Sequence, residues 1–200
     1  MQVHSFLHSD TETYTHVLAD VQQQVCAIID PVLDFDAKSG RTSTTSVDEV
    51  IGFVREHGWE LVYIIETHAH ADHISAAIHV KDTLGGQLII GQHITEVQKI
   101  FKQIFNFDTS FRTDASQFDI LTDEGDTLAL GNITITVMYV PGHTPADMAI
   151  LRLMMKRPWS LLVILYLLLM SERLAVTFQV GMPRRCTTQS RSSLRSLKIR

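Results

Sequence analysis

"ELVYIIETHAHADHISAA", residues 60–77, joins an apolar segment to a loop crowded with imidazoles. The apolar segment predicts a buried strand, and the loop after it carries His68, His70, Asp72 and His73. Residues two apart in an extended segment point to the same side, so His68 and His70 can face one point. Imidazole and carboxylate groups suit zinc and ferrous iron, and a site without cysteine ligands is typical of open centres. The loop therefore predicts a catalytic metal centre, with Asp72 as its catalytic carboxylate.

Strand-like and helix-like segments alternate along the first 150 residues, which indicates an α/β layered domain. Predicted strands are "TYTHVLAD" (13–20), "VCAIID" (25–30), "QLIIG" (87–91) and two strands around a Gly131-Asn132 turn. Predicted helices are "VIGFVREHG" (50–58), "ISAAIHVKDTLGG" (74–86) and "TEVQKIFKQIF" (95–105).

The helix over residues 50–58 has recognisable ends. Ser46 and Glu49 match the S-x-x-E capping box, and Gly58 supplies a stop. One face of this helix is predicted to be buried, since it carries Val47, Val50, Ile51 and Val54.

A second histidine loop, "VPGHTP", follows the predicted hairpin and places His143 on a tight turn at a strand end. Sheets of this class commonly assemble sites at strand ends, so His143 is a predicted metal ligand beside the first loop. Asp30 either accepts hydrogen bonds from the ligand loop or caps a turn. The remaining histidines have no such neighbours and are predicted to be ordinary structural residues: His4, His8, His16, His57, His79 and His93.

The net charge of −5 hides an internal break. Residues 1–150 carry 7 Lys and Arg against 21 Asp and Glu, whereas residues 151–200 carry 10 against 1. The run "PWSLLVILYLLLM" in the second part is shorter than the roughly 18–20 residues that span a bilayer, so no stable membrane insertion is expected. The basic end after it is only a weak nucleic-acid pattern, and we expect no nucleic-acid partner.

Two cysteines, Cys26 and Cys186, cannot form a disulfide framework. The N-terminal segment "MQVHSFLHSDTETYTH" has neither the basic nor the apolar region of a secretory signal. Both features predict a cytoplasmic protein.

"THAHADH" (67–73) followed by "PGHTP" (141–145) resembles the metallo-β-lactamase superfamily. Within it, "IIDPVLDFDAKSGRTSTTS", "GQHITEVQKIF" and "PGHTPADMA" are similar to the bacterial persulfide dioxygenases, also named β-lactamase hydrolase-like proteins. These are relatives of the mitochondrial enzyme of ethylmalonic encephalopathy. The resemblance covers nearly all of residues 5–150, which we take as the metallo-β-lactamase-like domain.

The resemblance implies an αββα sandwich with one Fe(II) per chain, which adds O2 to glutathione persulfide and gives sulfite and glutathione. His68 and His143 match iron ligands of that group. His70, Asp72 and His73 match positions that bind metal in dinuclear hydrolases. The alternative is therefore a glyoxalase II-like hydrolase of glutathione thioesters with two Zn(II). Ala69 and "DFDAKSGRTST" favour the dioxygenase, and the oligomeric state is open, a homodimer included.

The resemblance also implies a third ligand from a "GDTLF" strand after "PGHTPADMA", which this chain lacks. Because Met has a single codon, reading "MMK" from the third base of each codon gives Asp and then Glu. Allowed codons over residues 153–182 permit "GDTLF" in that frame. A frameshift near residue 150 therefore explains the charge break, leaves the N-terminal half of the sandwich intact and makes residues 151–200 an aberrant tail. A membrane-associating tail is the alternative. We expect the chain to be impaired, or an inactive truncated product.

Overall fold

The computed structural model describes residues 1–70, 73–140, 146–157 and 160–166, with side chains up to residue 149. Its strands are β1 (Gln2–His8), β2 (Thr13–Asp20), β3 (Val25–Ile29), β4 (Val32–Asp36), β5 (Arg41–Ser43), β6 (Glu60–Ile65), β7 (Ile74–Ser75), β8 (Gln87–Gly91), β9 (Ile120–Thr122), β10 (Thr127–Leu130), β11 (Ile133–Tyr139), β12 (Met148–Arg157) and β13 (Ser160–Tyr166). Its helices are α1 (Thr45–Glu56), α2 (Ala77–Leu84) and α3 (Ile94–Ile104).

The described strands form three sheets. A six-stranded sheet has the order β1-β2-β3-β6-β8-β9, in which β3, β6, β8 and β9 run parallel. A four-stranded antiparallel sheet has the order β10-β11-β12-β13, and a small sheet joins β5, β4 and β7. The parallel strands bring their carboxyl ends to one edge, which is where sites assemble in sheets of this class.

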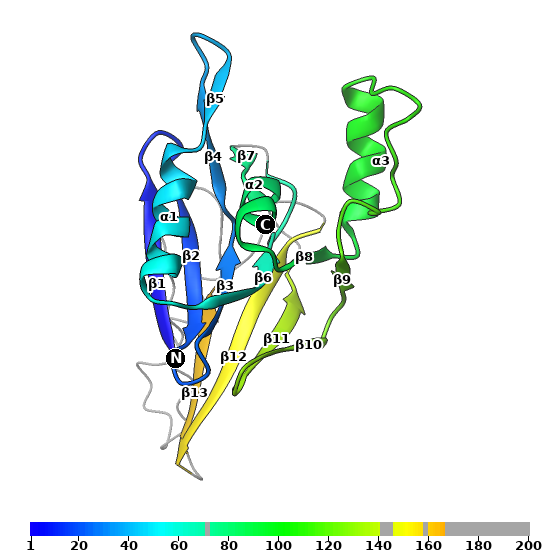
Figure 1. Ribbon diagram of the computed structural model, residues 1–200. Coiled ribbons are helices and arrows are strands. Elements are labelled where there is room, and N and C mark those ends of the chain that lie inside the picture. The colour runs from blue at the N-terminus through cyan, green and yellow to red at the C-terminus, as the bar shows by residue number, and fades with distance from the viewer. Residues whose placement is uncertain (71–72, 141–145, 158–159, 167–200) are drawn as a thin grey trace, which may run out of the picture.

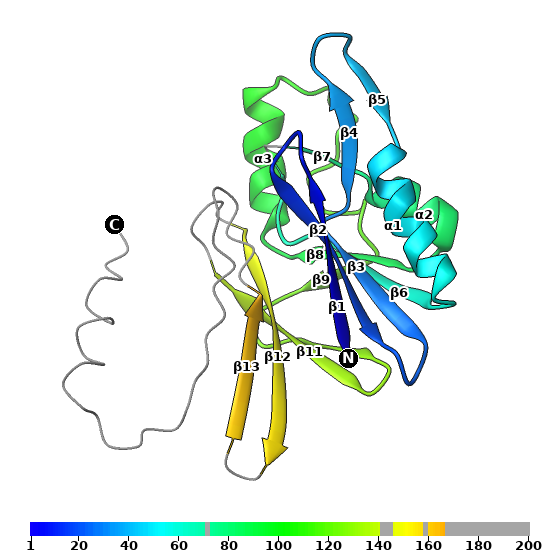
Figure 2. The same ribbon diagram turned by 90° about the vertical axis from the view of Figure 1, so that its left-hand side faces the viewer.

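The elements stack in layers (Figures 1 and 2). Helices α1 and α2 cover one face of the six-stranded sheet and share a core with its strands, which includes Val17, Ile28, Val50, Val54, Ile64 and Val80. The opposite face packs against the four-stranded sheet through Leu18, Ile29, Ile65, Ile89, Leu130, Ile135 and Val137. Alternate residues of β10 and β11 are buried and exposed. Within the described residues, no helix covers the outer face of that sheet, so three layers of α, β and β are defined.

The predicted burial of helix α1 is confirmed, because Val47, Val50, Ile51 and Val54 are its buried residues. The predicted capping box is wrong. The helix begins at Thr45 with Thr44 as its N-cap, and Ser46 lies inside the first turn. Asp34 explains the difference, since its carboxylate accepts hydrogen bonds from both the backbone N–H and the hydroxyl of Ser46.

The helix predicted over residues 74–86 begins later than expected. Ile74 and Ser75 form the short strand β7 beside β4, and α2 starts only at Ala77. The sequence predicts His73 directly before a helix. In the structure His73 precedes the strand β7 instead. The predicted end is confirmed, because Gly85 is the C-cap and has a positive φ of 77°.

The described residues contain no helix that is both long enough and apolar enough to cross a bilayer.

Candidate metal centre

The ligand loop starts where three parallel strands end. The backbone N–H of Asp30, just after β3, donates to the carbonyl of Ile65 at the end of β6 (2.9 Å). The N–H of Glu66 donates in turn to the carbonyl of Ile89 in β8 (2.9 Å). The ladder of the sheet therefore places the carboxylates of Asp30 and Glu66 next to each other at the first residues of the loop.

Asp30 accepts three hydrogen bonds from the loop. Its Oδ1 accepts from the backbone N–H of Thr67 (2.7 Å) and from Nε2 of His70 (3.0 Å), and its Oδ2 accepts from the Thr67 hydroxyl (2.8 Å). The residue has a φ of 48°, which Asp and Asn adopt more readily than most residues. Of the two roles predicted for Asp30, that of an acceptor for the ligand loop is confirmed.

His70 is held through one ring nitrogen. Its Nε2 lies 3.0 Å from Oδ1 of Asp30 and 2.9 Å from Oε2 of Glu66. The three side chains are almost fully buried, with exposed fractions of 3% for His70, 3% for Asp30 and 5% for Glu66. The other nitrogen, Nδ1, is also buried, and the described residues give it no hydrogen-bond partner. A histidine that donates one N–H to a carboxylate and leaves the second nitrogen open is the usual form of a metal ligand.

The tautomer of His68 follows from the same network. The hydroxyl of Thr67 gives its single proton to the Asp30 carboxylate, which can only accept. The hydroxyl oxygen, 2.9 Å from Nδ1 of His68, must then accept from that nitrogen. Nε2 of His68 is therefore the nitrogen that carries the lone pair. Through these contacts Asp30 selects, in the neutral rings of His68 and His70, the tautomer whose other nitrogen can bind a metal.

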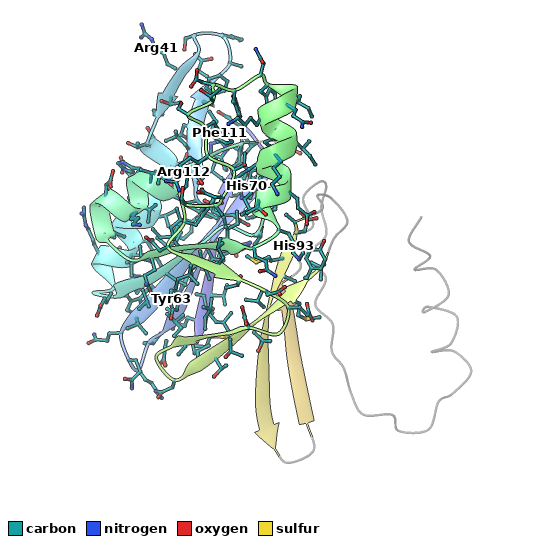
Figure 3. All side chains as sticks on the ribbon, turned by 90° about the vertical axis from the view of Figure 1, so that its right-hand side faces the viewer. Arg41, Tyr63, His70, His93, Phe111 and Arg112 are labelled. Carbon is teal, nitrogen blue, oxygen red and sulfur yellow. The ribbon has the colours of Figure 1, made fainter. Side chains whose placement is uncertain are left out.

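Three imidazoles gather at this point. The ring centroids of His68 and His70 are 4.1 Å apart, and those of His70 and His73 are 4.0 Å apart. Figure 3 shows His70 near the middle of the molecule rather than on its outline. The predicted neighbours His68, His70 and His73 are thus brought together, while Asp72 and His143 lie outside the described residues. The five residues remain predicted ligands.

The charges of the buried groups are strongly linked. Burial alone would lower the pKa of His70, but the carboxylates of Asp30 and Glu66 outweigh it and raise that pKa to about 10. Burial also tends to raise the pKa of Asp30, yet its contacts with His70 and Thr67 hold it below the usual value. Burial dominates at Glu66 and raises its pKa. A metal cation at Nδ1 of His70 would satisfy the same two carboxylates that the extra proton satisfies.

Asp30, Glu66 and His70 each place one potential ligand atom within 4.8 Å of the others. Their hydrogen bonds argue against a metal between them, since one nitrogen cannot both donate its N–H and coordinate a metal. The residues fit a metal bound at Nδ1 of His70, whose ring centroid lies 4.1 Å from that of His68 and 4.0 Å from that of His73. Asp30 and Glu66 then support the ligands. No sequence motif assigns a role to Glu66, although the residue stands between a predicted buried strand and "THAHADH".

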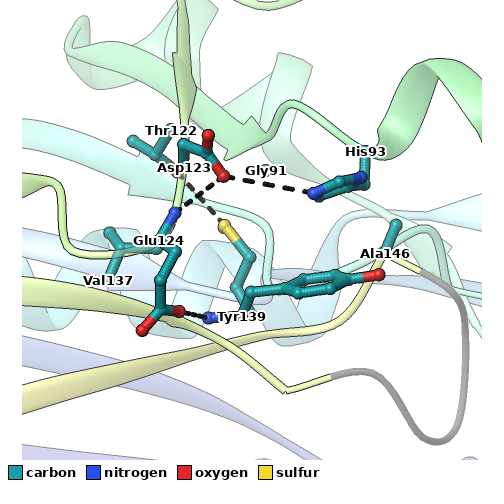
Figure 4. Close-up of a pocket in the computed structure, with 9 residues that line it drawn as sticks. Gly91, His93, Thr122, Asp123, Glu124, Val137, Tyr139 and Ala146 are labelled. Atoms are coloured by element: carbon teal, nitrogen blue, oxygen red, sulfur yellow. Dashed lines mark hydrogen bonds and ion pairs between the residues drawn. The ribbon is translucent and has the colours of Figure 1, made fainter.

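A hollow is lined by two residues that flank the second histidine loop in the sequence (Figure 4). Tyr139 and Ala146, on either side of residues 141–145, line it together with Gly91, His93, Thr122, Asp123, Glu124, Val137 and Met148. The ring of His93 stacks on that of Tyr139 with centroids 4.3 Å apart. A Cβ at Gly91 would come within 2.8 Å of the Met148 side chain, which would have to shift to make room for it.

The six histidines predicted to be structural lie in separate contacts. His8 meets Asp34 at 3.1 Å, His16 meets Ser5 at 2.8 Å, and His79 meets Asp48 at 2.8 Å. The ring centroid of His4 lies 4.5 Å from that of Phe53. Nδ1 of His57 lies 2.9 Å from the carbonyl oxygen of Phe53, and His93 stacks on Tyr139 as described above. These contacts agree with ordinary structural roles.

Comparison with known proteins gives a family and several relatives. The metallo-beta-lactamase superfamily matches residues 15–153. A Burkholderia pseudomallei protein named "Probable metallo-hydrolase" is 49% identical over 74% of this chain and 50% of its own length. A "Beta-lactamase hydrolase-like protein" from Xylella fastidiosa is 42% identical over 73% of this chain and 34% of its own length. "Glyoxylase B2" from Dictyostelium discoideum is 38% identical over 72% of this chain and 50% of its own length.

Proteins named for persulfide dioxygenation are less similar. "Persulfide dioxygenase ETHE1, mitochondrial" from Mus musculus is 28% identical over 66% of this chain and 41% of its own length. The crystal structure of ETHE1 from Myxococcus xanthus superposes with a TM-score of 0.58 at 23% identity, over 76% of this chain and 54% of that chain. The chain spans half or less of the length of these curated relatives. With an α/β fold, a histidine loop at the strand ends and a family match over most of its described residues, the chain belongs to the metallo-beta-lactamase superfamily.

Proposed function

We propose that this chain is the metal-binding part of a metal-dependent hydrolase, and that its substrates are small thioesters of the glutathione type. The observation that carries the proposal is the buried Nδ1 of His70, which the described residues leave without a hydrogen bond while Nε2 is anchored to Asp30 and Glu66. In the mononuclear iron group that the sequence resembles, the match to this position is not a ligand. A coordinating His70 therefore favours the hydrolase group.

The residues divide into ligands and supports. His68, His70, His73 and His143, with Asp72, would hold the metal, which supplies activation of water and polarisation of the carbonyl. Asp30 and Thr67 set the protonated nitrogen of the ring at His68 and His70. Ala69 of the loop packs against an apolar cluster that includes Ile90 and Ala146, which would limit bulk water on that side of the site. Hydrolysis would convert thioester and water to a carboxylic acid and a thiol.

The names of the more similar relatives also support a hydrolase. Those named for hydrolysis, or for glyoxylase activity, are 38–49% identical to this chain. The sequence motifs had favoured a persulfide dioxygenase with one Fe(II) and with O2 and glutathione persulfide as substrates. Relatives with that name are 26–28% identical. We therefore place the hydrolase first and keep the dioxygenase as the second candidate, which the segment "DFDAKSGRTST" and these relatives favour.

The activity of this particular chain is a separate question. We infer that residues 1–150 form the N-terminal half of an αββα sandwich and that residues 151–200 replace its second half. The carboxylate ligand expected after "PGHTPADMA" is then lost with that half. The chain would bind metal through its histidines but turn over slowly or not at all. Cytoplasmic location, the absence of a nucleic-acid partner and a possible homodimer remain predictions.

Metal analysis together with two assays tests these candidates. The full chain and a frame-restored version would be loaded with Zn(II) or, without oxygen, with Fe(II). We expect the frame-restored protein to bind two zinc ions and to hydrolyse S-lactoylglutathione. One iron per chain, with O2 uptake on addition of glutathione persulfide and no thioester hydrolysis, would replace the hydrolase by the dioxygenase. Absence of both activities in the frame-restored protein would refute both candidates.

A further inference from the structure

Glu66 is a buried carboxylate at the entrance of the ligand loop, and neither candidate reaction assigns it a part. We propose that Glu66 is a positioning residue, which fixes the ring of His70 for metal binding and fastens the end of the loop through Ser75. The proposal rests on the metal centre of the proposed function, in which His70 is a ligand.

The first support is the double contact on His70. Oε2 of Glu66 lies 2.9 Å from Nε2 of His70, and Oδ1 of Asp30 lies 3.0 Å from the same nitrogen. Asp30 alone would suffice to keep the proton on Nε2. Two acceptors that converge on one N–H also restrict rotation of the ring, because the N–H must point between them. The direction of Nδ1, on the other side of the ring, is fixed as a result.

The second support is the partner of the other Glu66 oxygen. The hydroxyl of Ser75 donates to Oε1 of Glu66, and the backbone N–H of Ala77 donates to the Ser75 hydroxyl oxygen (3.0 Å). Ser75 belongs to β7, where it pairs with Val32 of β4. The carboxylate thus connects the first residue of the loop to the strand and helix that follow it, across the segment that carries His68, His70 and His73.

The third support is the free-energy cost of the position. Glu66 is 4% exposed, and a buried carboxylate is costly unless its oxygens are hydrogen-bonded. Both oxygens have partners here, but an apolar side chain at the end of a buried strand would avoid that cost altogether. The carboxylate is therefore better explained by what it does to His70 and Ser75 than by the stability of the sheet.

The test uses the full chain, kept in solution by a solubility tag, with Zn(II) alone as the probe. Zinc affinity is measured by competition with a chromophoric chelator, and the absorption spectrum of the Co(II) form reports ligand geometry. The variants are Glu66→Gln, Ser75→Ala and the double variant. Glu49→Gln, an exposed position on α1, is the matched control. Glutamine keeps the size of the side chain but replaces one acceptor oxygen by a donor.

We expect Glu66→Gln to lower zinc affinity about tenfold, at the low end of the range for groups that support metal ligands, and to shift the Co(II) spectrum. Ser75→Ala should lower affinity less, and the double variant should match Glu66→Gln, because Ser75 acts through Glu66. The control should behave as the parent.

Parent-like zinc affinity and an unchanged Co(II) spectrum in Glu66→Gln would overturn the proposal and leave the metal centre standing. Additive losses for the two single variants would also overturn it. If Glu66→Gln loses its fold by circular dichroism, Ser75→Ala decides: a spectral shift in the folded variant supports the proposal, and a parent-like spectrum refutes it. Failure of the unsubstituted chain to bind zinc at all would instead overturn the metal centre and the proposed function together.

Discussion

Replacing Asp30 by asparagine should weaken metal binding without disturbing the backbone. Asparagine has nearly the same shape and also adopts a positive φ readily, so the value of 48° at this position adds no strain. The substitution therefore changes only the negative charge of the side chain and replaces one acceptor oxygen by a donor NH2 group. This matters because Oδ1 and Oδ2 of Asp30 accept all three of their hydrogen bonds from Thr67 and His70.

The expected loss can be worked from these contacts. In the asparagine variant, an NH2 group at the Oδ1 position would face two other donors, the N–H groups of Thr67 and His70. The side-chain amide will therefore place its NH2 group at the Oδ2 position. It then donates to the Thr67 hydroxyl, whose proton turns to Nδ1 of His68, 2.9 Å away. His68 is thereby driven to the tautomer with Nε2 protonated, which cannot bind metal. A hydrogen bond to a charged group contributes about 1.5–3 kcal/mol, which corresponds to a loss of roughly 10–100-fold in affinity.

Zinc titration in competition with a chromophoric chelator measures this loss, with the full chain as parent. Asp82→Asn, an exposed position on α2, is the control for the loss of one negative charge. Circular dichroism checks that the variant keeps its fold. Zinc affinity within about twofold of the parent would refute the assignment of Asp30 as the residue that directs the two imidazoles, since roughly tenfold is the smallest loss expected.

Three further outcomes are expected. Thr67→Val should lower zinc affinity about tenfold whereas Thr67→Ser should not, because only the hydroxyl links Asp30 to His68; equal affinities for the two variants would contradict the link. Cys26 is fully buried and burial raises its pKa to about 12, so peptide mapping should find it unalkylated by iodoacetamide until the chain is unfolded; labelling of the native chain would contradict this burial. If residues 151–200 replace the second half of the sandwich, an apolar sheet face is left uncovered, so the untagged full chain should be poorly soluble by sedimentation and should show no O2 uptake with persulfide. A soluble, active chain would refute the frameshift hypothesis.

Much of the fold could be predicted where the signal is local. The segments "TYTHVLAD" and "QLIIG" coincide with β2 and β8, because β-branched and apolar residues between turn signals define buried strands. The four valine and isoleucine positions of α1 follow the helical period and are buried. The strands β4 and β5 escaped prediction, since "VLDFD" and "RTS" are partly exposed and polar and depend on pairing with each other.

Errors arose where a distant residue competes with a local signal. Ser46 matches a capping box, but Asp34, twelve positions earlier, takes both of its donors. Ser75 looks like part of a helix, yet it pairs with Val32 and donates to Glu66. Local patterns cannot show which of several acceptors a hydroxyl will meet in the folded chain.

In the site, too, local features could be predicted from the sequence and contacts between distant residues could not. The predicted ligands His68, His70 and His73 could be read from the sequence, because they stand within six residues of one another after a predicted buried strand. The supporting groups could not be read in this way, since Asp30 reaches the loop only through the pairing of β3 with β6. The role of Asp30 was left open by the sequence, and that of Glu66 was not anticipated.

The hydrogen bonds that set the imidazoles of His68 and His70 lie close together in the described part of this chain. The residues involved lie between Asp30 and Ser75, on strand ends that belong to the six-stranded sheet or pair with β4. Among the described residues, each contact that sets the His68 and His70 tautomers comes from Asp30, Glu66 or Thr67. Loss of a downstream carboxylate ligand would therefore lower metal affinity in parent and variants alike. The ratio of zinc affinities between Asp30→Asn and parent should then be the same in this chain and in a frame-restored version. Unequal ratios would mean that the second half of the sandwich also acts on these imidazoles.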